Sequence, residues 1–130
     1  MVTYLTFEQI VRLNQRTVEV HGGNFIPPSN LLHSEPLLYL IEAVEAKMFG
    51  EAIYPTVPDK AALYMHSIIS NHVFQDGDKR TGLGAALVFC IVNGWKISSE
   101  EFYDFTMAVA SGERDLDAVR EWFSAHATEQ

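Results

Sequence analysis

Apolar residues recur at helical spacing along most of the chain, and short clusters of Gly, Pro or Ser separate the periodic stretches. The first helix is predicted to start after Thr6, which forms a capping-box pattern with Gln9. The run HGG at 21–23 should end this helix. The segment NFIPPSN (24–30) follows and contains too much proline to be helical.

A second apolar stripe begins near Ser34 and predicts a helix that stops at Gly50. The next segment, EAIYPTV (51–57), is short, partly β-branched and interrupted by proline, which favours an exposed β-hairpin or flap over a central strand. A third helix is predicted from about Asp59. Its apolar face continues as far as His72, so the His72 side chain is expected to point inward at the end of that helix.

The run LGAALVFCIVNG (83–94) is apolar on nearly all sides, which is typical of a helix surrounded by others. Two more helices should follow, one after a capping-box pattern of Ser98 and Glu101 and one from about Asp115. These elements predict an all-α helical bundle with a short β-hairpin flap. No repeat or linker divides the chain, so we expect one domain over residues 1–130.

Composition narrows the classes of function. Nine Lys and Arg residues against 17 Asp and Glu residues give a formal charge of −8, which disfavours direct binding to nucleic acid. No signal-peptide pattern opens the chain and no apolar run is long enough to span a bilayer, so we expect a cytoplasmic protein without a membrane partner. The single cysteine, Cys90, lies in an apolar run and is expected to act as a small hydrophobic residue.

The segment NHVFQDGDKR (71–80) carries the candidate chemistry. It joins one helix to the start of the central one, where unpaired backbone N–H groups favour an anion. Gly77 permits close approach of the backbone to a ligand, and Lys79 and Arg80 add charges suited to phosphate oxygens. The segment therefore predicts a site for the phosphates of a nucleotide.

The same segment supplies a possible metal ligand and a possible base. Asp76 suits Mg²⁺, which usually takes one or two carboxylates together with phosphate and water, and His72 is a candidate general base for a substrate hydroxyl. An alternative reading makes the segment a solvated turn with Asp78 as N-cap and the two cations as surface charges. Phe74 is expected to anchor the loop in the core under either reading.

This segment resembles the signature of the Fic/Doc family, His-x-Phe-x-(Asp/Glu)-Gly-Asn-(Gly/Lys)-Arg. The matching residues are His72, Phe74, Asp76, Gly77, Lys79 and Arg80. Lys79 stands where AMP-transferring Fic enzymes have glycine, so the chain is more similar to the death-on-curing (Doc) toxin branch. The resemblance extends over essentially the whole chain.

The resemblance implies an all-α enzyme that uses ATP and Mg²⁺ to modify a hydroxyl group on a protein. In the Doc branch the γ-phosphate is transferred, the target is translation elongation factor Tu, and a Phd-like antitoxin is the partner of the toxin. Transfer of AMP is the alternative reaction. A catalytically silent domain that only binds an antitoxin or a nucleotide is a third possibility.

The resemblance also implies roles for individual residues. His72 would be the catalytic base and Asp76 the metal ligand. The phosphates would be bound by Gly77, Asp78, Lys79 and Arg80. Residues 51–57 would form the flap, whose exposed edge, including Ile53 and Tyr54, could hold a target peptide by strand addition.

Asp78 departs from the signature, which has asparagine at this position. An ionised carboxylate cannot donate a hydrogen bond and repels phosphate, so one interpretation is impaired ATP binding or altered use of the metal. The other interpretation is that aspartate caps the central helix as well as asparagine does, with Mg²⁺ neutralising the added charge.

Overall fold

The computed structural model describes residues 1–130 and is built mainly of helices. In chain order these are α1 (Phe7–His21), α2 (Ser34–Ala43), α3 (Val57–Ser70), α4 (Asp78–Val92), α5 (Phe102–Ser111) and α6 (Leu116–His126). Two small antiparallel sheets pair β1 (Lys47–Met48) with β2 (Glu51–Ala52) and β3 (Trp95–Ile97) with β4 (Ala127–Glu129). The predicted all-α class is confirmed. None of the helices is both long enough and apolar enough to cross a bilayer.

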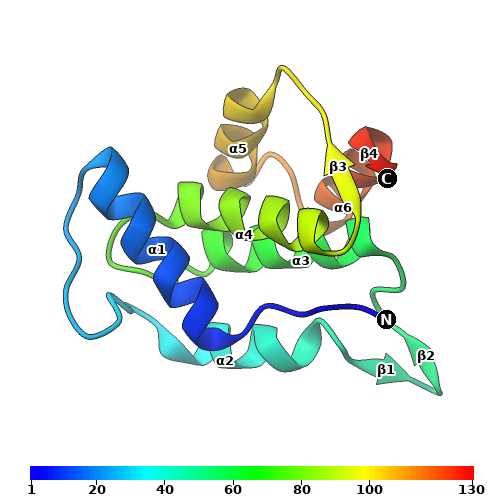
Figure 1. Ribbon diagram of the computed structural model, residues 1–130, viewed down its shortest axis with the longest axis horizontal. Coiled ribbons are helices and arrows are strands. Elements are labelled where there is room, and N and C mark those ends of the chain that lie inside the picture. The colour runs from blue at the N-terminus through cyan, green and yellow to red at the C-terminus, as the bar shows by residue number, and fades with distance from the viewer.

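Helices α3 and α4 lie side by side at the centre, and the other helices pack around this pair (Figure 1). Helix α1 crosses α4 on the near side in Figure 1, α5 lies above α4, and α6 packs on α3. The connection between α3 and α4 lies at one end of the central pair, and the β1–β2 hairpin lies beyond the other end (Figure 1). The two connections that flank α3 are therefore far apart.

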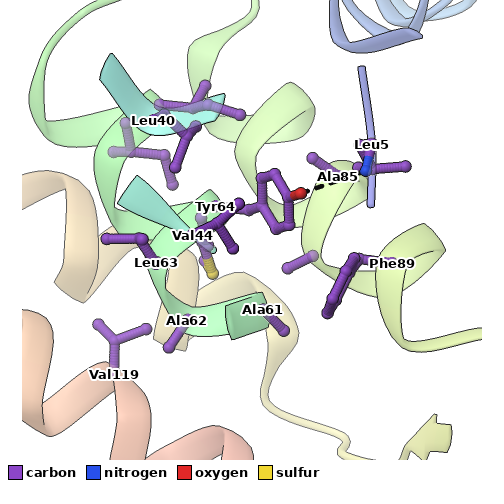
Figure 2. Packing of buried hydrophobic residues seen from close by; sticks show 14 of the residues in the cluster. Leu5, Leu40, Val44, Ala61, Ala62, Leu63, Tyr64, Ala85, Phe89 and Val119 are labelled. Atoms are coloured by element: carbon purple, nitrogen blue, oxygen red, sulfur yellow. Dashed lines mark hydrogen bonds between the residues drawn. The ribbon is translucent and has the colours of Figure 1, made fainter. Parts of the chain in front are cut away.

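Helix α3 supplies much of the hydrophobic core, because most of its residues are buried. At the centre of this core lies Tyr64, whose ring is 5.0 Å from the ring of Phe89 and whose hydroxyl accepts the Leu5 amide at 3.2 Å (Figure 2). Close packing of α3 on α4 requires Gly82, since a Cβ there would lie 2.7 Å from Cγ1 of Ile69. This glycine fixes the approach of the two central helices.

The hairpin differs from the prediction in its position. Helix α2 ends at Ala43, and the hairpin spans residues 47–52 where 51–57 was expected. The reason is the turn, where Phe49 (φ 52°) and Gly50 (φ 82°) both adopt the left-handed conformation that a tight two-residue hairpin turn requires. Residues 53–56 then lead directly into α3.

The capping box predicted before α5 is also absent. The N-cap is Glu101, and it makes no side-chain cap hydrogen bond. The Ser98 amide instead donates to the carbonyl oxygen of His126 (3.1 Å), which extends the pairing of β3 with β4. The paired residues lie about 30 positions apart in sequence. Their pairing uses backbone that the local sequence pattern assigned to a helix cap.

Candidate active site

The 71–77 loop begins where α3 ends, and His72 lies outside the helix. Its φ angle is 48°, in the left-handed region, and its side chain is exposed. The expectation that His72 points inward was wrong, because α3 ends at Ser70 and the helical face does not continue to residue 72. The turn at His72 instead directs the next two side chains, Val73 and Phe74, into the core.

A segment that precedes α2 holds this loop in place by backbone pairing. The Gln75 amide donates to the carbonyl oxygen of Asn30 (2.8 Å), and the Leu32 amide donates to that of Val73 (2.8 Å). Leu31 and Phe74 form an antiparallel bridge between the two segments. The Pro-rich segment is thus the neighbour of the loop, although it is more than 40 residues away in sequence.

A network of buried polar side chains fixes the backbone of the 71–77 loop. The side-chain amide of Asn14, which is fully buried in α1, donates to the carbonyl oxygen of Asp76 (2.7 Å) and to Oγ1 of Thr81 (3.1 Å). Asn30, also buried, donates to Oδ1 of Asn14 (2.9 Å) and more weakly to the Asp76 carbonyl (3.4 Å). Buried polar groups are tolerated when they are paired in this way, and a satisfied network specifies one arrangement of the backbone.

Gly77 is required by this packing as well as by its conformation. Its φ angle is 84°, and a Cβ would lie 3.0 Å from Nδ2 of Asn14 and 3.3 Å from Cγ2 of Val18. The glycine was predicted to let the backbone approach a ligand. The Cα of Gly77 faces α1, however, so the missing side chain allows α1 to pack closely against the loop.

The Asp76 carboxylate is exposed but held on one side. Its Oδ2 accepts the Asn24 amide (3.1 Å), and Gly23 lies so close that a Cβ there would be 2.6 Å from Oδ2. The other oxygen remains available. No group of three or more His, Cys, Asp or Glu side chains is arranged to hold a metal ion. An exposed carboxylate with one free oxygen suits a cation such as Mg²⁺, which usually takes one or two carboxylates and fills its other positions with phosphate oxygens and water.

Asp78 does not cap its own helix. Its Oδ1 accepts the amide of Phe74 at 2.8 Å, four residues back in the loop, and the N-cap position is taken by Gly77. The first amide to bond within the α4 backbone is that of Thr81, to Gly77 O (2.9 Å), so the three preceding amides stay free for an anion. Burial raises the pKa of the Asp78 carboxyl above its usual value, and the Phe74 amide and nearby cations partly oppose this shift.

Of the four predicted phosphate ligands, Gly77 and Asp78 are half-buried, whereas Lys79 and Arg80 are exposed at the start of α4. Neither Lys79 nor Arg80 forms an ion pair within the chain. They line a cavity of about 180 Å³ with no hydrophobic residue in its wall. Its other lining residues are Thr17, His21, Gly22, Asp76, Gly77 and Asp78. Free helix amides, two unpaired cations and a nearby carboxylate form a site that fits phosphate groups and a bound Mg²⁺.

Ile53 and Tyr54 lie away from this site, because they precede the first residue of α3 and the loop follows its last. The 14 residues of α3 separate them from the loop by about 20 Å at the usual helical rise. The Tyr54 ring lies under the guanidinium group of Arg120 (5.3 Å), and its carbonyl oxygen accepts a hydrogen bond from the buried Lys60. The structure therefore does not bring the predicted flap residues together with His72.

Three residues that shape the site, Asn14, Asn30 and Gly23, were not predicted from the sequence. Asn14 carries a signal, because it lies four residues after Ile10 and four before Val18 on the buried face of α1. A polar residue in the middle of an apolar helical stripe indicates a buried hydrogen-bonded role. Asn30 and Gly23 lie in irregular backbone and carry no comparable periodic signal.

The chain is similar in sequence to known proteins. Residues 4–90 match the Fic/DOC family. The chain is 34% identical over 79 residues to "Toxin Doc" of Mycolicibacterium smegmatis, a match that covers 58% of this chain and 61% of that protein. It is 28% identical over 120 residues to "Protein kinase doc" of Escherichia phage P1, a match that covers 89% of each. The chain belongs to the Fic/Doc family.

Proposed function

We propose that this protein is a Doc-like toxin that transfers the γ-phosphate of MgATP to a hydroxyl group of a protein target, with elongation factor Tu as the target. The names of the two relatives, a toxin and a protein kinase, support this assignment. The observation that carries it is the polar cavity at the start of α4, where free amides, two unpaired cations and the Asp76 carboxylate lie together.

In this proposal the chain positions the phosphates and does little covalent chemistry. The free amides at the start of α4 and the cations Lys79 and Arg80 bind phosphate oxygens, and Asp76 holds the metal ion. ATP would supply the γ-phosphoryl group and leave as ADP, and Mg²⁺ held by Asp76 would neutralise part of the phosphate charge. Phosphoryl transfer depends mainly on positioning and charge stabilisation, so this set of groups is sufficient.

His72 acts as the general base. Its exposed position at the turn after α3 lets the imidazole reach a hydroxyl on another protein, and the neutral ring accepts the proton that this hydroxyl loses. The buried side chains of Val73 and Phe74, directly after it, anchor the turn. The base is therefore exposed on a backbone that is fixed.

Asp78 differs from the asparagine of the family signature, but it can accept the same kind of hydrogen bond from the loop backbone. Its bond from the Phe74 amide needs only a side-chain oxygen, which asparagine also provides. The carboxylate nevertheless adds negative charge beside the phosphate site. We therefore propose that the wild-type protein is an active enzyme and that it binds its nucleotide less tightly than the Asp78→Asn variant does.

The proposed partners follow from the same assignment. A toxin of this class needs an antitoxin, and we propose a Phd-like protein for this role. Elongation factor Tu places the proposed activity in the cytoplasm.

The test is the intact mass of purified elongation factor Tu after incubation with this protein and MgATP. A phosphate-sized gain with the wild type, and none with His72→Ala, is the expected result. An AMP-sized gain would replace the proposed reaction by adenylyl transfer. No gain with either the wild type or Asp78→Asn would reject elongation factor Tu as the target.

A further inference from the structure

The polar cavity at the start of α4 has a second wall, which lies outside the 71–80 segment. Its residues are Thr17, His21 and Gly22, from the last turns of α1 and the position directly after it. Gly22 has no side chain, so Thr17 and His21 supply the polar groups of this wall. Residues four positions apart lie on the same face of a helix. The cavity is therefore bordered by the end of α1 as well as by the start of α4.

Contacts on both sides of His21 hold this wall against the loop. Before it, Cγ2 of the buried Val18 lies 3.3 Å from the position that a Cβ would take at Gly77. After it, the Asn24 amide donates to Oδ2 of Asp76 at 3.1 Å. His21 lies between two residues that touch the loop, so its exposed side chain is kept at the edge of the cavity.

Both side chains of this wall are free to bind a ligand. Of the five histidines, only His126 has a ring nitrogen in a hydrogen bond, and no histidine forms an ion pair. The hydroxyl group of the half-buried Thr17 makes no hydrogen bond within the chain, whereas that of Thr81 accepts one from Asn14. Imidazole and hydroxyl groups can both donate hydrogen bonds, so the end of α1 presents two unused donors to the cavity.

The charged side chains around the cavity cancel one another. Lys79 and Arg80 contribute two positive charges, and Asp76 and Asp78 contribute two negative ones. The asparagine of the family signature at position 78 would leave one positive charge in excess. The end of α1 also carries the partial negative charge of its helix dipole, which a histidine in the last turn offsets. Donors on α1 therefore favour an anion that the charges at the start of α4 alone do not.

We propose that Thr17 and His21 are phosphate-binding residues, which donate hydrogen bonds to the same phosphate chain that Lys79 and Arg80 bind from α4. This inference rests on the proposed function. The phosphates are then held between two helices, and the packing of α1 on the loop sets their position relative to Asp76. If His21 served only to stabilise the end of α1, its loss would lower the stability of the protein and leave phosphate binding unchanged.

The experiment measures binding of inorganic tripolyphosphate in the presence of Mg²⁺ by calorimetry. We expect His21→Ala to weaken binding by about fivefold or more, and His21→Lys, which restores a donor and a positive charge, to stay within about threefold of the wild type. Thr17→Val keeps the shape of the side chain without its hydroxyl group and should weaken binding by about threefold to tenfold. Arg16→Ala is the matched control, because it removes an exposed positive charge from α1 outside the cavity, and its affinity should stay within about twofold.

Equal affinity of His21→Ala and the wild type would overturn the proposed role of His21, and a lower thermal midpoint in that variant would then assign the residue to helix stability alone. An equal loss of affinity in Arg16→Ala would also overturn it, because the effect would be one of overall charge. If the wild type binds neither tripolyphosphate nor MgATP, or if Arg80→Ala weakens neither, the proposed function itself fails. Binding that depends on Arg80 but not on Thr17 or His21 would reject only the second wall.

Discussion

The two connections that flank α3 are held by different forces. The loop after α3 exposes His72 and Asp76, yet its backbone is bound by the buried side chains of Asn14 and Asn30 and by pairing with residues 30–33. The β1–β2 hairpin before α3 has strands of two residues each, and its tip residue Phe49 is 98% exposed.

The difference indicates that the position of the backbone matters more in the loop after α3 than in the hairpin. Buried polar side chains cost free energy unless all of them are paired, and α1 places one directly beneath the Asp76 carbonyl. No comparable network supports the hairpin turn. Exposed functional side chains on a rigid backbone are typical of a site that must hold a ligand in one geometry.

Replacing the base should have the largest effect. His72→Ala is expected to lower phosphoryl transfer by about 100-fold to 10,000-fold, since a positioned general base contributes this much. Because His72 does not line the polar cavity, binding of MgATP should change by less than about twofold. Single-turnover transfer and calorimetry measure the two quantities. Full phosphoryl transfer by His72→Ala would show that His72 is not the catalytic base.

Breaking the network should give the next largest effect. Asn14→Ala leaves the Asp76 carbonyl with only the weak Asn30 bond and removes the partner of the Thr81 hydroxyl, so we expect a loss of about 2–4 kcal/mol in the free energy of unfolding. Urea unfolding measures it. A loss below about 0.5 kcal/mol, the usual range for surface changes, would show that the network does not fix the loop.

Two glycines allow the connections to be compared directly. Gly77 in the loop and Gly50 in the hairpin have φ angles of 84° and 82°, but only at Gly77 would a Cβ meet neighbouring side chains. Gly50→Ala should cost about 1 kcal/mol for the left-handed backbone, and Gly77→Ala roughly twice as much. Equal losses in urea unfolding would mean that α1 does not constrain the loop.

The smallest effect is expected at Asp78, and it should depend on pH. Burial raises the pKa of Asp78 in the folded protein, so folding favours the protonated form and stability falls as the pH rises above the value of 3.8 for an unperturbed carboxyl. Asp78→Asn lacks this penalty. It should be more stable than the wild type at pH 7 by less than about 1 kcal/mol.

This gain should shrink as the pH is lowered toward 4, and the same variant should bind MgATP more tightly. Urea unfolding across this pH range and calorimetry at pH 7 test the two statements. An Asp78→Asn variant that is less stable at pH 7, or whose gain in stability grows at low pH, would contradict the assignment of a partly buried carboxylate at position 78.

Several features that depend on neighbours in sequence were predicted correctly, although the capping box of Ser98 and Glu101 and the end of the second helix at Gly50 were not. The capping box of Thr6 and Gln9 is present, α1 ends at His21, and α6 begins at Leu116, where a helix from about Asp115 was expected. Helix existence follows from the apolar period and from local caps, which lie within a few residues of each other. The motif itself lies within ten residues, so its candidate ligands could be identified from the sequence.

Features set by distant contacts could not be predicted. The inward orientation expected for His72 fails because α3 ends at Ser70 and the loop that follows pairs with residues 30–33. The bonds of Asn14 to Asp76 and Thr81 join residues 62 and 67 positions apart. Helical periodicity indicates that Asn14 is buried but not which groups it binds.

The most direct test of the central claim is to map MgATP on the backbone amides by two-dimensional NMR, for which a 14.6 kDa chain is well suited. The account predicts the largest shifts at residues 77–81, with the hairpin at 47–52 unchanged. Shifts centred on the hairpin, or none at the start of α4 under saturating MgATP, would contradict the claim that the loop between α3 and α4 is the nucleotide site.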